Sequence, residues 1–225
     1  MPQDPNDEPA SVLLEEIAIQ RQLLIKNGEC KKQSKDFQAD KTPPALSLPS
    51  NWQWSQVYEC AILRSGVSFP ADRELDKGSY LYCKVGDMNM VGNEQELRTS
   101  SRFVTATEKE LLSAIPPNSI AFPKRGGAIA TNKKRYINEL LFVDLNIMTL
   151  NPIQPLSVNY FMTWLNSFDL ALLNSGTSVP QINNKDIGPL FVPIPPLLEQ
   201  HRIVAKVDEL MALCDTLEQQ QEDSI

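Results

Sequence analysis

The sequence predicts an α+β fold, in which a globular body of mixed helices and strands has a helix at each end. Apolar residues recur at steps of three and four over residues 11–27 and again after residue 197, as in amphipathic helices. Between these segments, short β-like runs alternate with turn signals. With 225 residues, the chain is long enough to bury a core in one or two domains.

The first helix is expected over residues 11–27, because Asn27-Gly28 is a typical C-terminal stop signal. Residues 29–50 are rich in lysine, serine and proline, and we expect them to form a linker. This change in composition places a domain boundary near residue 45.

The body is expected over residues 51–190, where turn signals separate five short runs of strand-like composition. These predicted strands are 52–58, 80–85, 119–122, 128–131 and 141–150. Residues 158–173 are apolar and aromatic without helix breakers, so they predict a helix. A polar loop follows over 173–182, and residues 183–186 are expected to start a short strand or a helical turn.

The last helix is expected to begin at Leu197 or Leu198, after a proline-rich extended segment over 191–196. Its apolar residues follow one another at spacings of 4, 3, 4 and 3, which is the a/d pattern of a coiled coil. This predicted packing seam consists of Ile203, Val207, Leu210, Cys214 and Leu217. No glycine or proline stop precedes Ile225, so we expect the chain to end inside a helix, as a fragment or a half-length form.

The formal net charge of −7 is unevenly distributed. Residues 1–20 hold five acidic residues and no basic one, and residues 196–225 hold seven acidic and two basic residues. Residues 21–195 hold 19 basic and 16 acidic residues, so the middle of the chain is net positive. Because charges are screened beyond about 8 Å, local charge matters more than net charge for binding a polyanion. The middle of the chain is therefore the part in which a site for a polyanion is expected.

One dense basic segment lies in the positive part, at residues 121–136, where five basic residues occur and no acidic one. They are Lys124, Arg125, Lys133, Lys134 and Arg135. Such a segment is a candidate for phosphate contacts, and Gly126-Gly127 would let the backbone approach DNA closely. The alternative is an ordinary solvated surface loop, because charge runs are usually solvated.

The sequence lacks the motifs of several chemistries. The four cysteines, at 30, 60, 83 and 214, lie more than 20 residues apart, which argues against a zinc knuckle and favours buried free thiols. The single histidine, His201, lies in a predicted helix and is expected to be structural or solvent-facing. Neither a phosphate-binding glycine motif nor the Asn-Pro-Pro-aromatic signature of adenine methyltransferases occurs. The chain is therefore predicted to be non-catalytic and to hold no metal.

The composition also bears on location. No apolar run reaches the roughly 18–20 residues that a membrane span needs. The acidic, polar N-terminus does not have the pattern of a secretory signal. We therefore expect a cytoplasmic protein without membrane contact.

Five segments, taken in order, resemble one known family. Residues 14–32 resemble its L-x-x-I-x-x-x-R-x-x-L-I-x-x-G-x-x-K-K helix, and residues 48–54 (LPSNWQW) resemble its L-P-x-x-W-x-W motif. Residues 84–88 (KVGDM) resemble its K-x-G-D-[IM] strand end, and 179–183 (VPQIN) resemble a later loop. Residues 190–204 (LFVPIPPLLEQHRIV) are similar to its closing P-x-P-P-L-x-E-Q-x-R-I-V segment. The family comprises the specificity (S) subunits of type I restriction-modification enzymes.

The resemblance implies a target recognition domain flanked by long helices that pack as an antiparallel coiled coil. A full S subunit has two such domains, each of which reads one half of a split DNA target, and the helices set the gap. This chain resembles the N-terminal half or a half-length form. The implied divisions are an N-terminal helix and linker (1–45), a target recognition domain (46–196) and a C-terminal spacer helix (197–225).

The resemblance also implies partners. Methylation would belong to modification subunits that bind S-adenosylmethionine, and cleavage to an ATP-driven restriction subunit, so S-adenosylmethionine, ATP and Mg²⁺ are expected only on partner subunits. Double-stranded DNA would be the ligand of this chain, and the seam could also form a homodimer. The alternatives are a coiled-coil scaffold without DNA reading and, disfavoured by the missing signature, a stand-alone methyltransferase.

Base reading needs side chains with paired donors and acceptors, such as arginine, lysine, asparagine and glutamine. Lys84 and Asn89, at the end of a predicted strand, are candidates, and so are Ser178 and Gln181 in the later loop. Gln181 could instead cap local structure. The five cations of the basic segment remain the candidates for phosphate contacts.

Overall fold

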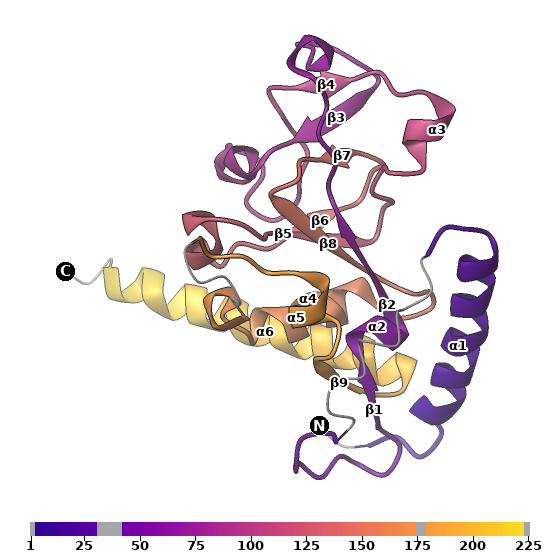
Figure 1. Ribbon diagram of the computed structural model, residues 1–225. Helices are drawn as coiled ribbons and strands as arrows, with labels where there is room; N and C mark the ends of the chain where they lie inside the picture. Colours follow the sequence, from indigo (N-terminus) through magenta and orange to yellow (C-terminus); the bar gives the residue numbers. More distant parts are fainter. Residues whose placement is uncertain (1–2, 31–41, 174–178, 223–225) are drawn as a thin grey trace.

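The computed structural model describes residues 3–30, 42–173 and 179–222, and it confirms the predicted mixed α+β architecture (Figure 1). The first helix, α1, spans Ala10–Lys26, and the last helix, α6, spans Leu197–Glu222, both close to their predicted bounds. The strands of the described chain form three sheets, of two, four and three strands.

The two-stranded sheet joins the beginning and the end of the body. Strands β1 (Gln53–Gln56) and β9 (Phe191–Ile194) pair antiparallel, with Trp54 opposite Pro193. A proline is tolerated in β9 because a two-stranded sheet has free edges on which no amide donor is needed. The pairing places the segment after the linker directly beside the segment that leads into α6.

The central sheet has four antiparallel strands in the order β2-β8-β5-β6. Their bounds are Ala61–Ser65 for β2, Ile147–Pro152 for β8, Ser119–Pro123 for β5 and Arg135–Ile137 for β6. Helix α4 (Val158–Asn166) packs on β5 and β8. All five residues of β5 are buried, because both faces of this central strand are covered.

The third sheet is smaller and lies at the end of the body farthest from α6 (Figure 1). It has the order β4 (Phe103–Val104), β3 (Tyr80–Cys83) and β7 (Phe142–Val143), with β3 parallel to β7. Its separate core is rich in aromatic residues. The rings of Phe69 and Tyr82 pack in a T-shaped arrangement with their centres 5.2 Å apart. The short helix α3 (Glu108–Leu111) lies beside it.

The main core joins the helices to the central sheet. Ala10, Leu13 and Ile17 on the inner face of α1 share this core with the central sheet and α4. Helix α1 packs on α2 (Val57–Cys60), whereas the beginning of α6 packs on α4. The antiparallel pairing expected of the long helices is therefore not made between α1 and α6 of this chain, because the apolar face of α1 is used by the body. The divisions at residues 45 and 196 stay predictions.

Residues 128–131, predicted as a strand, instead form the 3-10 helix η4 (Gly127–Thr131). Gly126 before it has φ +73° and Asn132 after it has φ +52°, so both ends turn through the left-handed region. These two turns reverse the chain between β5 and β6, and no strand can form there.

Residues 141–150, predicted as one run, form the two strands β7 and β8. Asp144 interrupts them, because its carboxylate accepts hydrogen bonds from the backbone N and the Nδ2 of Asn146 (3.0 and 2.8 Å). This turn carries the chain from the small sheet to the central sheet. The helix predicted over 158–173 is interrupted as well, since α4 ends early and a 3-10 helix, η5, follows at Leu170–Leu173.

Other elements depart from the sequence patterns. The run predicted over 52–58 stops at Gln56, where the Glu59 carboxylate accepts a hydrogen bond from the Gln56 backbone N (3.1 Å) and starts α2. In the segment 183–186, predicted as a short strand or helical turn, Asn183 is the N-cap and the rest begins the helix α5 (Asn184–Ile187). Sequence patterns do not predict β2 or β6.

The cysteines and the histidine are placed largely as expected. Cys60 and Cys83 are buried, and this burial raises the pKa of both thiols to about 12. Cys30 is half-buried, and Cys214 is exposed on α6, so the expectation of four buried thiols is wrong for Cys214. His201 is exposed on α6, as predicted.

Gly66, directly after β2, lies against the backbone of the turn between β7 and β8. A Cβ at this position would lie 2.1 Å from the Asp144 carbonyl oxygen and 2.2 Å from that of Val143. We expect Gly66→Ala to lower the free energy of unfolding by about 3 kcal/mol, since backbone atoms must move. Gly86→Ala is the matched control, because a Cβ there meets nothing within 4 Å. Equal urea midpoints for both variants would contradict the close approach.

Candidate nucleic-acid interface

The basic segment is the connection between β5 and β6, and η4 divides it into two groups of cations. Lys124 and Arg125 precede η4, whereas Lys133, Lys134 and Arg135 follow it. The two left-handed residues that reverse the chain determine this division. The five cations therefore do not form one continuous stripe, and each group has its own surroundings.

The first group lies beside a loop that is distant in sequence. The Gly126 backbone N donates to the Pro180 carbonyl (2.8 Å), and the Ile182 N donates to the Lys124 carbonyl (2.9 Å). These bonds place Arg125 opposite Gln181 in a short antiparallel bridge. The structure thus brings together two predicted contact residues that are more than 50 positions apart.

Arg125 is the most accessible of the predicted cations. Its side chain is exposed, and its guanidinium makes no hydrogen bond or ion pair with the described residues. Gln181 is half-buried, and its Nε2 donates to Asn183 Oδ1 (2.7 Å), so the alternative of a local structural contact is also realised. A free guanidinium next to a side-chain amide offers the donors and acceptor that base edges and phosphates need.

The glycines next to Arg125 leave the surface open. A Cβ at Gly126 or at Gly127 would meet nothing within 4 Å. Gly126 also needs its φ of +73°, which other residues adopt only with strain. The backbone here is therefore accessible to a bulky ligand.

Lys124 is directed partly inward. Its ammonium donates to Ser65 Oγ at the end of β2 (2.8 Å). Burial, and secondly the nearby Arg125, lower the pKa of Lys124. It adds positive charge next to Arg125 but is less free to move toward a ligand.

The second group connects to the turn after β3. The Lys133 ammonium donates to Asn89 Oδ1, so these two predicted contact residues lie side by side. Arg135 donates to the Met88 carbonyl (3.1 Å) and the Lys134 carbonyl (2.9 Å), and burial lowers its pKa. The second group therefore fastens β6 to the 3-10 helix η3 (Val85–Asn89).

Lys134 requires a correction. Its side chain is buried, and its ammonium donates to Asn132 Oδ1 (2.8 Å) and to the Phe168 carbonyl (2.9 Å). Burial lowers its pKa. Because Asn132 Oδ1 also accepts from the Leu170 N (3.0 Å), Lys134 and Asn132 together hold η5 against the turn after η4. Lys134 points into the protein and is not available to a phosphate.

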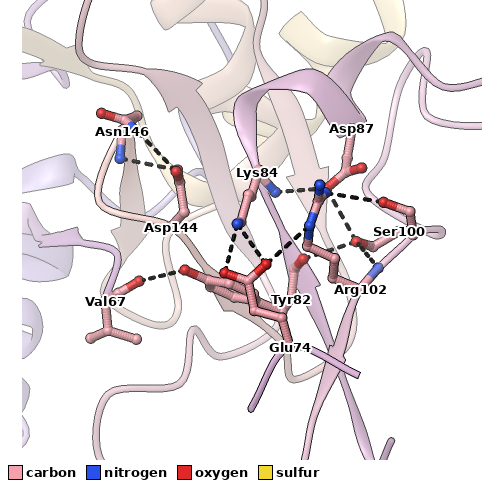
Figure 2. Close-up of polar contacts among 10 residues, drawn as sticks. Val67, Glu74, Tyr82, Lys84, Asp87, Ser100, Arg102, Asp144 and Asn146 are labelled. Atoms are coloured by element: carbon pink, nitrogen blue, oxygen red, sulfur yellow. Dashed lines mark hydrogen bonds and ion pairs between the residues drawn. The ribbon is translucent and has the colours of Figure 1, made fainter. Parts of the chain in front are cut away.

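Lys84 is also engaged with the protein itself (Figure 2). Its ammonium lies 2.6 Å from both carboxylate oxygens of Glu74, and 5.6 Å from the centre of the Tyr82 ring. Its backbone N donates to the Asp87 carboxylate (2.7 Å), which starts η3. Lys84 would have to leave Glu74 before it could read a base.

The same carboxylate reveals a cation that sequence patterns missed. Arg102 Nε lies 3.1 Å from Glu74, so Glu74 holds Lys84 and Arg102 together (Figure 2). Ser100 Oγ holds the segment just before β4 against β3. It donates to the Tyr82 carbonyl (2.8 Å) and accepts from the Arg102 N (3.1 Å). Arg102 lies outside the basic segment, and only the pairing of β3 with β4 could have indicated it.

Ser178 lies outside the described residues. Groups of three or more His, Cys, Asp or Glu residues that could hold a metal ion are absent from the described part of the chain. In the same part, no helix is both long and apolar enough to cross a membrane.

The predicted seam of α6 changes character along the helix. Ile203 and Val207 are half-buried, and Ile203 packs on the main core. Leu210 is 49% exposed, Leu217 is 65% exposed, and Cys214 is exposed as well. The first half of α6 thus rests on the body, whereas the apolar positions of its second half are uncovered by the described residues.

The chain matches the family model of the type I restriction modification DNA specificity domain over residues 49–225. It is 29% identical to the type I restriction enzyme EcoAI specificity subunit of Escherichia coli over 96% of this chain, and 26% identical to the EcoEI specificity subunit of the same organism over 98%. In both cases it spans only 38% of the relative's length.

Solved structures show the same fold. The HsdS subunit from Thermoanaerobacter tengcongensis matches with a TM-score of 0.64 at 21% identity, over 94% of this chain and 51% of that one. A chain from a structure of type I R-M system assembly matches with a TM-score of 0.66 at 22% identity, over 95% of this chain and 52% of that one. With a family model that covers everything from the segment before β1 to the end of α6, the chain belongs to the family of type I restriction modification DNA specificity domains.

Proposed function

We propose that this chain reads one half of a bipartite DNA target as the specificity subunit, or part of it, of a type I restriction-modification system. It would dock modification and restriction subunits, which would supply methylation and cleavage together with S-adenosylmethionine, ATP and Mg²⁺. The chain itself would be non-catalytic and would need no cofactor. A cytoplasmic location belongs to the same proposal.

The observation that carries this proposal is the placement of Arg125 beside Gln181. Arg125, whose exposed guanidinium has no partner among the described residues, lies opposite Gln181 in a backbone bridge, on a loop whose two glycines leave the backbone open. The Gln181 amide, which is bonded to Asn183, would have to exchange that bond for one to a base. Arginine makes two parallel hydrogen bonds to guanine or to a phosphate, and glutamine pairs with adenine. This surface therefore has the donors and acceptors of direct base readout, with Lys124 beside Arg125 to contribute positive charge.

The second half of α6 supports a role as a spacer that pairs with another helix. Its apolar positions are uncovered, and a 3.5-residue apolar repeat favours packing along a second long helix. Since the chain spans about half the length of its structural relatives, a second copy of this chain is one partner that would supply such a helix. The resulting homodimer would present two identical readers.

The alternative is a scaffold that assembles such a complex without reading DNA. It is favoured by the number of predicted contact residues that are engaged internally, namely Lys84 with Glu74, Lys133 with Asn89, and the buried Lys134. Footprinting on DNA fragments with modification subunits present distinguishes the two functions. A scaffold gives no protection that follows a sequence.

Arg125→Ala tests the reading surface. We expect the complex with modification subunits to bind duplex DNA about tenfold more weakly. The magnitude of the slope of log K against log salt should fall by about 0.9, because one phosphate contact is lost. Fluorescence anisotropy over a series of salt concentrations measures both. Lys109→Ala on α3 is the control, since it removes an exposed charge outside the candidate surface. If both variants bind like the unaltered chain, Arg125 is not at the interface.

Lys134→Met should show the opposite behaviour. It removes the side-chain donor to the Phe168 carbonyl and one of the two donors to Asn132 Oδ1, which keeps the Leu170 N, so we expect a loss of about 1–3 kcal/mol in the free energy of unfolding. The salt dependence of DNA binding should stay unchanged at a temperature where the variant is folded. A reduced salt slope with unchanged thermal stability would return Lys134 to the set of phosphate contacts.

The seam is tested by the double substitution Leu210→Glu with Leu217→Glu. Both positions are exposed, so we expect the body to fold normally while self-association is lost. Sedimentation equilibrium of the purified chain, with and without the substitutions, measures the mass. A chain that is monomeric at all concentrations before substitution would exclude the homodimer.

A further inference from the structure

The segment just before β1 contacts the first turns of α6, residues 197–202, which we call the base of this helix. Trp52, just before β1, donates from its indole Nε1 to Glu199 Oε2 on the first turns of α6 (3.0 Å). Gln3 donates from its Nε2 to the other oxygen, Oε1 (2.7 Å). The direction of α6 is thereby connected to two segments that lie more than 140 residues earlier in the chain.

The Glu199 carboxylate has little freedom. Glu199 is 1% exposed, and the groups that donate to it, the Gln3 amide and the Trp52 indole, are uncharged. A buried carboxylate is costly unless its oxygens accept hydrogen bonds, so rotating α6 away from Trp52 would leave an oxygen unsatisfied. The contact therefore favours one orientation of the helix over neighbouring ones.

Two adjacent contacts restrain the same helix from other sides. Gln200, which is 0% exposed, donates to the Pro195 carbonyl (3.0 Å) and accepts from the backbone N of Ser157 at the start of α4 (3.1 Å). One turn further along, the Arg202 guanidinium pairs with the buried carboxylate of Asp7. Apolar packing tolerates small rotations, whereas these bonds have specific directions.

Because α6 is long, a small change of its direction at the base displaces its far end by a larger distance. From Arg202 to residue 222 the helix extends by about 30 Å, at 1.5 Å per residue. A tilt of about 10° at the base would move its end by about 5 Å, which exceeds the 3.4 Å rise of one base pair. A change at the base would thus displace the far end of α6 by at least one base-pair step.

We propose that Glu199, Gln200 and Arg202 are positioning residues, which hold α6 in one direction relative to the reading body through Trp52, Gln3, Ser157 and Asp7. The direction itself is a property of this chain alone. Its consequence, a defined gap between two half-sites, rests on the proposed function.

The direction can be measured by electron paramagnetic resonance between two spin labels on the full chain. Ala212→Cys, at an exposed position of α6 outside the packing seam, carries one label, and Asn138→Cys, at an exposed position directly after β6, carries the other. Cys214→Ser and Cys30→Ser remove the exposed thiol of the seam and the half-buried thiol. Cys60 and Cys83 will not be labelled, because both are buried and their thiols have pKa values raised to about 12.

Trp52→Phe keeps an aromatic ring but removes the donor to Glu199, so we expect the distance distribution to broaden by several ångströms. Trp54→Phe is the matched control, since Trp54 packs on Phe191 and does not bond to Glu199; its distribution should stay narrow. Asp7→Asn weakens the pair with Arg202 and should broaden the distribution as well. If Trp52→Phe does not fold, Asp7→Asn decides the test.

Folded variants with the distribution of the unaltered chain would overturn the proposal, and so would equal broadening in the Trp54→Phe control. DNA is absent from this measurement, so the result is independent of the proposed function. In the assembled complex, Trp52→Phe should in addition bind targets whose gap is one base pair longer or shorter with affinity closer to that for the native gap. A complex that binds no DNA before substitution contradicts the proposed function and leaves the distance result intact.

Discussion

The pairing of β1 with β9 is the constraint on which the rest of the structure depends. It brings the segment after the linker against the segment before α6, so the body begins and ends at one place. Trp52 and Glu199 can meet only because these strands are paired. Helix α6 therefore leaves the body from a closed base, and its first turns are bonded to the body on several sides. The proposed roles of the body as reader and of α6 as spacer require such a connection.

The sequence predicted the large elements and the family well, because helical periodicity and proline-rich segments are local signals. The helices α1 and α6 and the extended segment at β9 were expected within a few residues. The strand predicted at 128–131 failed because Gly126 and Asn132 adopt left-handed conformations, which composition does not reveal. Short strands such as β6 depend on their partners in the sheet and have little periodicity of their own.

The candidate site was harder to predict than the fold, for a physical reason. Sequence shows where cations are, but their availability depends on the carbonyls and carboxylates that tertiary structure places beside them. Lys134 is buried against the Phe168 carbonyl, 34 positions away, and Lys84 is held by Glu74 from a separate loop. The proximity of Arg125 to Gln181 was likewise invisible, since it depends on a bridge between distant segments.

The contacts that the predicted cations make within the protein also affect how strongly the candidate surface would bind DNA. A cation contributes fully to phosphate binding only if it gives up no existing partner, because breaking a charged contact offsets the new one. Lys84 would lose two contacts of 2.6 Å with Glu74, whereas Arg125 would lose none within the described chain. Few of the predicted contact cations are thus free for nonspecific attraction. A chain that reads DNA as proposed would depend on well-placed contacts more than on its own net charge.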